Sequence, residues 1–256
     1  NLEIVQLLLD NEKIDINIIN EYNWYDEELI FMNSSAYKVR NEYSQEKTPL
    51  INSILNCKNI EIIKILLKQP NIDVNLMTRY TKQYEIQEED HSYEESEVKN
   101  AFLIAIEKEN IDIINLLLNN NKTDINSIST YSDSEKKYCE KTGLIIATEK
   151  QNVEIVQLLL KSFSKEMNIS PKVSKCMKYT DNWSIEEWKE EPLLNIAVQN
   201  NDLKIVQLLL KSDLIDINAS SKTTNYFSEE ESELVKERTA LHIAVEKGNL
   251  EIIKLL

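Results

Sequence analysis

Apolar residues recur along the chain in a pattern that predicts a series of short helices. A stretch of eight or nine mostly apolar residues occurs six times, as NLEIVQLLL at Asn1, NIEIIKILL at Asn59, NIDIINLLL at Asn110, NVEIVQLLL at Asn152, DLKIVQLLL at Asp202 and NLEIIKLL at Asn249. In the second copy the apolar residues cover most of a helix and leave Glu61 and Lys64 on a narrow polar edge. Such a helix packs on both flanks, and its repetition predicts that neighbouring copies stack on one another.

A second helical pattern precedes five of these stretches. Its copies are TPLINSILNCK from Thr48, NAFLIAIEKE from Asn100, TGLIIATEKQ from Thr142, PLLNIAVQNN from Pro192 and TALHIAVEKG from Thr239. Each copy begins at a residue suited to a helix start, because Thr and Asn cap free N–H groups and Pro fits the first turn. The repeating unit is therefore predicted to contain two helices.

A short polar phrase follows the second helix of most units. It occurs as KIDIN ending at Asn17, NIDVN at Asn75, KTDIN at Asn126 and LIDIN at Asn218, and a copy without the acidic residue, EMNIS, occupies 166–170. Alternating apolar and polar residues followed by Asn predict a short strand that enters a turn.

The last unit carries a family resemblance. TALHIAVEKGNLEIIKLL from Thr239 closely resembles an ankyrin repeat, including the T-x-L-H-x-A start and Gly248 before Asn249. The resemblance implies antiparallel helix pairs stacked side by side, with hairpins projecting from one edge. We therefore expect a mainly α fold, an ankyrin-type solenoid of stacked helix-turn-helix pairs with extended β-hairpin-like connectors. It also implies that His242 forms hydrogen bonds that tie neighbouring repeats.

The turn between the two helices departs from the family pattern. Gly occurs there only at Gly248, and the comparable positions hold Lys58, Glu109, Gln151 and Asn201. A turn without Gly needs a residue that tolerates positive φ or a different geometry, and Asn is better suited than Glu or Gln. We therefore expect the shape of this turn to vary between repeats.

The spacing of the units predicts a long insertion in every repeat. Successive first helices start 52, 42, 50 and 47 residues apart, against about 33 for a plain ankyrin repeat. We expect one array, truncated at both ends, with repeat units near 1–17, 48–75, 100–126, 142–170, 191–218 and 239–256. The insertions then occupy 18–47, 76–99, 127–141, 171–190 and 219–238.

The insertions contain all eleven Tyr and all three Trp of the chain. Such rings are enriched where proteins bind one another, but they also favour strands and pack across them. Both roles can coexist. The candidate partner-binding residues are Tyr22, Trp24, Tyr25, Tyr84, Tyr93, Trp183, Trp188, Tyr226 and Phe227.

Two insertions differ in how well they suit a hairpin. Residues 23–33 and 36–43 contain strand-forming runs that can pair around Asn33 to Ala36. Residues 84–98, YEIQEEDHSYEESEV, contain so many carboxylates that we expect them to pair poorly.

The overall charge narrows the partner classes. The formal net charge is -15, which disfavours nucleic acid and anionic membranes because both require clustered Lys and Arg. The apolar stretches are much shorter than the roughly 20 residues that span a bilayer. The three Cys lie far apart without metal-ligand spacing, so we expect reduced thiols in a cytoplasmic, intracellular protein.

No arrangement typical of catalysis is found. The chain has two His, His91 beside Asp90 and His242 at a helix start, and two Gly, so neither a catalytic triad nor a phosphate-binding loop is indicated. We therefore expect no catalytic, cofactor-binding or metal-binding residues. His91 is expected to be solvated.

The favoured function is a non-catalytic protein-protein interaction scaffold or adaptor. Its partner is expected to be a protein, with a basic surface as one option because the connectors are acidic. One alternative is the targeting or regulatory arm of an enzyme, a kinase or ubiquitin ligase, whose catalytic domain lies outside this sequence. Another is a purely structural spacer.

Overall fold

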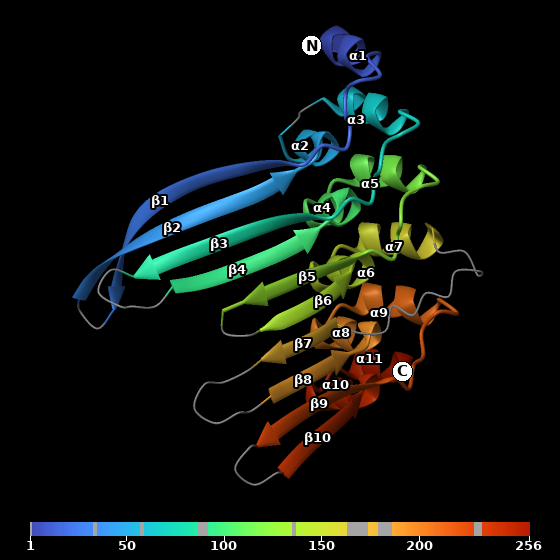
Figure 1. Cartoon of the computed structure of the whole chain (residues 1–256). Helices are drawn as coiled ribbons and strands as arrows, with labels where there is room; N and C mark the ends of the chain where they lie inside the picture. Colours follow the sequence, from blue (N-terminus) through green and yellow to red (C-terminus); the bar gives the residue numbers. More distant parts are fainter. Residues whose placement is uncertain are drawn as a thin grey trace. The chain divides into compact units, whose positions relative to one another are not determined.

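The computed structural model describes residues 2–32, 35–56, 59–86, 92–134, 137–162, 174–178, 186–227 and 232–256. They form two compact units, Asn1–Ser134 and Glu135–Leu256, and Figure 1 labels the helices and strands of each. Unit 1 contains the helices α1 (Leu2–Leu9), α2 (Pro49–Asn56), α3 (Ile60–Leu67), α4 (Ala101–Glu107) and α5 (Ile111–Leu118), and the strands β1 (Asn20–Met32), β2 (Ser35–Lys47), β3 (Thr78–Ile86), β4 (Ser92–Lys99) and β5 (Ile128–Asp133).

Unit 2 repeats the same arrangement. Its helices are α6 (Gly143–Glu149), α7 (Val153–Ser162), α8 (Leu193–Gln199), α9 (Leu203–Leu210), α10 (Ala240–Glu246) and α11 (Leu250–Leu255). Its strands are β6 (Tyr138–Thr142), β7 (Ser174–Lys178), β8 (Glu186–Glu191), β9 (Ser220–Phe227) and β10 (Ser232–Thr239). No helix among the described residues has the length and apolar character needed to cross a membrane.

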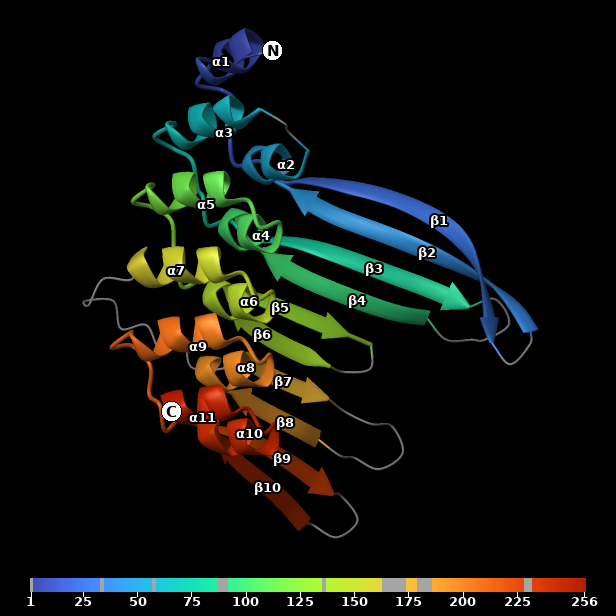
Figure 2. The ribbon, with the colours of Figure 1, turned by 180° about the vertical axis from the view of Figure 1, so that it is seen from behind.

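Within each unit the helices form two layers. In unit 1, α2 packs on α4, while α3 packs between α1 and α5. In unit 2, α6, α8 and α10 form one layer and α7, α9 and α11 form the other. The hairpins extend from the layer of first helices, as the opposite views of Figures 1 and 2 show for both units.

The core lies between the two helix layers and is made of the apolar residues of the repeated phrases. Phe102, Leu103, Ile114 and Leu117 are fully buried in unit 1, and Ile145, Ile155, Ile205 and Leu209 are fully buried in unit 2. Ala105, Ala147, Ala197 and Ala244 are also fully buried, which lets the helix backbones approach closely. The predicted helix pairs are therefore confirmed.

The predicted caps are confirmed at four first helices. The side chains of Thr48, Asn100, Thr142 and Thr239 each accept the backbone N–H three residues further on. Pro192 lies at the cap position of α8 rather than inside the helix and forms no side-chain hydrogen bond there. These caps satisfy N–H groups that the first turn of a helix leaves free.

The four described turns between paired helices share one shape, contrary to expectation, while the turn at Lys58 lies outside the described residues. Glu109, Gln151, Asn201 and Gly248 all adopt positive φ, between 55° and 66°. In all four turns the N–H of the following residue donates to the carbonyl five residues earlier, as Asn110 N donates to Ala105 O at 3.1 Å. This is a Schellman closure. At these four turns the prediction was wrong because satisfying the free carbonyls outweighs the roughly 1 to 2 kcal/mol cost of a left-handed L residue.

The polar phrase after the second helix is a turn and not the predicted strand. In the described copies the Asp side chain accepts the N–H two residues later, as Asp73 Oδ1 accepts Asn75 N–H at 2.9 Å. The same bond is formed by Asp15, Asp124 and Asp216. Asp favours this local bond over strand pairing, which explains why the apolar alternation was misleading. The EMNIS copy lies outside the described residues.

The Asn of this phrase joins one repeat to the next. Asn17 Nδ2 donates to Asn71 O at 2.8 Å, and Asn17 Oδ1 accepts Asp73 N–H at 2.8 Å. Asn75 repeats the pattern one unit later, with Lys122 O at 2.7 Å and Asp124 N–H at 2.8 Å. Each of these amide side chains therefore spans two successive turns of unit 1.

The insertions form antiparallel hairpins, so the fold is mixed rather than mainly α, as strands and helices hold comparable shares of the described residues. The strands follow one another in chain order in each unit, β1 to β5 and β6 to β10. The predicted pairing of β1 with β2 is confirmed. The fold class is thus corrected by the length of the hairpins, whose strands reach 13 residues.

The acidic insertion also forms a hairpin, contrary to prediction. β3 pairs with β4, and the rings of Tyr84 and Tyr93 stack across the pair with centroids 4.9 Å apart. Lys82 lies opposite Glu95, and Gln83 donates to Glu94. Cross-strand attraction therefore offsets the repulsion that the acidic composition alone suggested.

Two further expectations are corrected. The hydrogen bonds of His242 in the structure go to Thr239 of its own helix start, where the two residues form a capping box. Asn195, which occupies the same place in α8, does bond to the next repeat, because its Nδ2 donates to Arg238 O at 2.8 Å. Cys139, expected as a reduced thiol, is disulfide-bonded and buried, and lies opposite Cys176 in the β6–β7 pair.

Candidate functional site

Strand register gathers seven of the described aromatic residues of unit 1 on one face of its sheet. Residues that are directly opposite in an antiparallel pair share a face. Trp24 lies opposite Tyr43, Gln45 opposite Tyr80, and Tyr84 opposite Tyr93. We name this surface the aromatic face, and its residues are Tyr22, Trp24, Asp26, Asn41, Tyr43, Gln45, Tyr80, Lys82, Tyr84, Tyr93, Glu95, Glu97, Tyr131 and Asp133.

The rings of the aromatic face contact one another across hairpins. Trp24 stacks on Tyr43 with centroids 5.1 Å apart, and both rings lie 6.4 Å from the ring of Tyr80. The ring of Trp24 belongs to the first hairpin and that of Tyr80 to the second, so this cluster ties two insertions together. Trp24 nevertheless stays 43% exposed.

Carboxylates lie among these rings. Asp26 accepts hydrogen bonds from Asn41 Nδ2 at 2.8 Å and from the Tyr43 hydroxyl at 3.3 Å. Burial raises the pKa of the Tyr80 phenol, and the charges of Glu97, Glu95 and Asp26 raise it further. Burial, Glu95 and Asp133 likewise raise the pKa of Tyr131. The face therefore carries a negative potential that opposes further negative charge.

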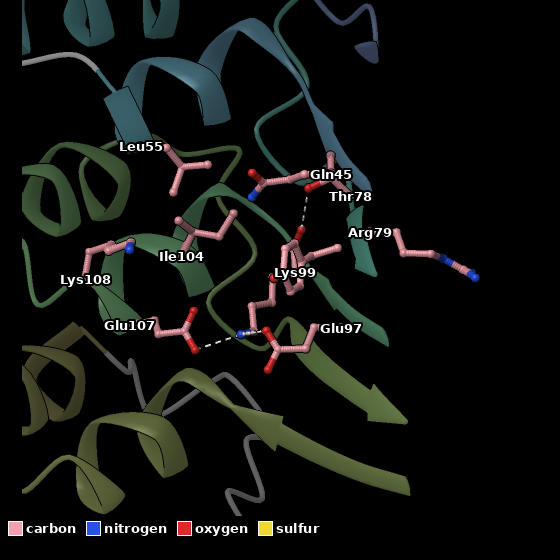
Figure 3. A pocket seen from close by; sticks show the side chains of 10 residues that line it. Gln45, Leu55, Thr78, Arg79, Glu97, Lys99, Ile104, Glu107 and Lys108 are labelled. Atoms are coloured by element: carbon pink, nitrogen blue, oxygen red, sulfur yellow. Dashed lines mark hydrogen bonds and ion pairs between the residues drawn. The ribbon is translucent and has the colours of Figure 1, made fainter. Parts of the chain in front are cut away.

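A pocket of about 200 Å³ lies where the aromatic face meets the first helices of unit 1 (Figure 3). The sheet contributes Gln45, Thr78, Arg79, Tyr80, Glu97 and Lys99. The helices α2 and α4 contribute Leu55, Ile104 and Glu107, and Lys108 follows the end of α4. The pocket thus combines two aliphatic side chains, one ring and a group of charges. Arg79 extends away from that group in Figure 3.

Lys99 is held between two carboxylates in this pocket. Its Nζ lies 2.5 Å from Glu97 Oε2 and 2.7 Å from Glu107 Oε1, and its side chain is only 13% exposed. Burial by itself lowers the pKa of Lys99, but hydrogen bonds to Glu107 and Glu97, together with their charges, outweigh it and raise the pKa. The three groups carry one net negative charge.

The pairing of Lys99 with Glu107 recurs at the same place in other repeats. The residue before the first-helix cap faces the residue eight positions later, as Lys141 faces Glu149 at 2.7 Å and Arg238 faces Glu246 at 3.2 Å. In the first repeat Leu55 stands where Glu107 stands in the next. The sequence analysis missed Lys99, Glu97 and Glu107, although aligning the repeats on their caps would have revealed this spacing.

The structure separates the predicted partner-binding residues. Tyr22, Trp24, Tyr84 and Tyr93 lie on the aromatic face, while Tyr25 lies on the opposite face, 68% exposed, with the Arg40 guanidinium 5.3 Å above its ring. Trp188 belongs to β8, and Tyr226 and Phe227 belong to β9. Trp183 lies outside the described residues, as does His91.

The described side chains offer no group of three or more His, Cys, Asp or Glu arranged to hold a metal ion. What the aromatic face provides is area for contact, hydrogen-bonding groups and negative charge. Such a surface suits the binding of another molecule.

A family model described as ankyrin repeats (3 copies) matches residues 102–221 and 175–256, which together span more than half of the chain. Comparison with curated proteins gives no match. Ahead of residue 102, the α2 and α3 pair repeats the helix arrangement of the matched part.

Proposed function

The chain belongs to the ankyrin repeat family, and from this premise we propose that it is a non-catalytic scaffold or adaptor that binds a protein through the aromatic face. Ankyrin repeats are generally protein-binding modules, and stacked repeats present extended surfaces. The observation that carries the proposal is the partly exposed ring cluster of Trp24, Tyr43 and Tyr80. Tyr and Trp supply rigid contact area with a polar edge, which is typical of binding hot spots.

The charge of the same face supports a partner with a basic surface. Asp26, Glu95, Glu97 and Asp133 lie among the rings, against Lys82 and Lys99. A basic partner is attracted to this potential, and an acidic partner or nucleic acid is repelled. We propose a cytoplasmic location for this interaction.

The proposal is tested by comparing the two faces of the β1 strand. Proteins captured from a cell extract by the wild-type chain are quantified beside those captured by Trp24→Ala and by Tyr25→Ala. Both variants remove an exposed ring from the same strand, but only Trp24 belongs to the aromatic face. A specific partner is expected to be lost with Trp24→Ala and kept with Tyr25→Ala. Equal capture by all three chains contradicts the proposal.

The alternative of a targeting arm for a kinase or ubiquitin ligase uses the same surface and differs in what is joined to it. A kinase or ligase domain in the complete gene product favours this alternative, whereas repeats alone favour the scaffold.

A further inference from the structure

Several rings of the first two hairpins are already covered by cations of the chain itself. Lys47 Nζ lies 4.7 Å from the ring centroid of Tyr22, and Lys82 Nζ lies 5.9 Å from that of Tyr43 and 5.6 Å from that of Tyr84. A cation over a ring is attracted by the negative face of the π system. The fold thus uses this interaction repeatedly on one small surface.

Trp24 and Tyr80 are different. Within the described part of the chain, no Lys or Arg lies over either ring. The centroids of the two rings lie 6.4 Å apart across neighbouring hairpins. Tyr80 also lines the pocket that contains Glu97 and Glu107. The Tyr80 ring therefore stands beside a pair of carboxylates without a cation over it, and Trp24 lies next to Tyr80.

The carboxylates of the pocket can accept further hydrogen bonds. Lys99 engages Glu97 through Oε2 and Glu107 through Oε1, so one oxygen of each carboxylate remains able to accept another hydrogen bond. One lysine cannot neutralise two carboxylates, and the excess charge is negative. Leu55 and Ile104 supply apolar wall beside these charges.

The size of the pocket restricts its occupant. A volume of about 200 Å³ is below the roughly 300 to 1,000 Å³ of sites that enclose a whole small ligand. It suits one long side chain with an aliphatic stem and a charged end, because such a stem packs on apolar atoms while its head group stays paired.

Building on the proposed function, we infer that this pocket seats a Lys or Arg side chain from an extended segment of the partner protein. The cationic head lies between the Tyr80 ring and the carboxylates of Glu97 and Glu107, and the stem lies along Leu55 and Ile104. Trp24 contacts the segment next to this seat. The aromatic face thereby selects a basic residue at one position and not merely a basic surface.

The test uses three labelled synthetic peptides of equal length, in which Ser alternates with Lys, with Glu or with norleucine, and measures their binding by fluorescence anisotropy. The Lys peptide is expected to bind, and its affinity is expected to fall as the salt concentration rises. The Glu and norleucine peptides are expected not to bind. The Glu97→Gln and Glu107→Gln variants are each expected to weaken binding of the Lys peptide about three- to tenfold.

The decisive variant is Lys99→Met. It removes the resident cation and leaves two carboxylates for the peptide, so it is expected to bind the Lys peptide about three- to tenfold more tightly than wild type. Binding of this variant is compared only where its helical spectrum matches that of wild type, so that a gain in affinity belongs to folded protein. Glu149→Gln removes the matching carboxylate of the Lys141 pair in unit 2 and serves as the control with unchanged binding.

The results distinguish failure of the lysine seat from failure of the proposed function. Preference for the Glu or norleucine peptide, or weaker binding by Lys99→Met with its helical spectrum intact, overturns the lysine seat. The proposed function stands in that case if a captured protein still depends on Trp24. It fails if no captured protein depends on Trp24.

Discussion

The side chain of Asn75 is expected to hold two repeats of unit 1 together. Its Nδ2 donates to Lys122 O at 2.7 Å and its Oδ1 accepts Asp124 N–H at 2.8 Å. An intramolecular hydrogen bond contributes a net of about 0.5 to 1.5 kcal/mol. Asn75→Ala removes two such bonds, and because both lie near solvent we expect the free energy of unfolding to fall by about 1 to 2 kcal/mol.

The matched control is Asn218→Ala. Asn218 occupies the same phrase and keeps the same bond from its N–H to Asp216 Oδ1, but its side chain joins no second phrase within the described residues. Urea unfolding followed by circular dichroism at 222 nm gives the free energies. Hydrogen exchange should also show faster exchange of the Asp124 amide in Asn75→Ala. If both variants lose equal stability and Asp124 exchange is unchanged, the bridge is not stabilising.

Three further predictions follow from local geometry. Glu109→Gly is expected to stabilise the chain by about 0.5 to 1 kcal/mol because φ is +55° there. The control Lys108→Gly, at φ -78°, should destabilise the chain by a similar amount. The midpoints of urea unfolding measure both changes in stability. Peptide mapping without reductant should recover Cys139 linked to Cys176, and Cys139→Ser should cost about 4 kcal/mol because the bond closes a loop of about 38 residues; two alkylatable thiols would refute it. Folding favours the neutral form of the Tyr131 phenol, because its pKa is raised in the folded state. Its contribution to the free energy of unfolding is therefore full below about pH 10 and is lost at higher pH. The free energy of unfolding of Tyr131→Phe should fall less than that of wild type between about pH 9 and 11.

The helices could be predicted from the sequence because their information is local. A cap residue, an apolar stretch and a small residue such as Ala105 all lie within one helix pair, and the structure places each as expected. The positive φ of Glu109 could not be predicted in the same way, because residue preference at that site is overruled by the hydrogen bond from Asn110 to Ala105. A preference of about 1 to 2 kcal/mol is offset when this hydrogen bond closes the turn.

Only part of the candidate site could be predicted from the sequence, and the reason differs from the one that applies to the turn at Glu109. The spacing of Tyr22 and Trp24 places them on one face of a strand, and the sequence alone put the neighbouring Tyr25 in the same set of candidates. Deciding which face matters requires the register between hairpins, and β2 and β3 are separated by two helices in the sequence. Lys99 was missed because it lies in a strand and its partner Glu107 lies in the following helix. Neither the period of a strand nor that of a helix predicts a contact between two residues of different elements.

The helix stack itself sets that register. β2 and β4 end at Lys47 and Lys99, one residue before the caps Thr48 and Asn100, so the packing of α2 on α4 fixes where each strand begins its pairing. A slip of one residue between β2 and β3 would move Tyr80 to the face opposite Trp24 and Tyr43. It would leave the contacts of Lys99 with Glu97 and Glu107 in place, since all three residues lie where β4 enters α4 directly. The repeated apolar phrase therefore positions the aromatic face without contributing a single ring to it.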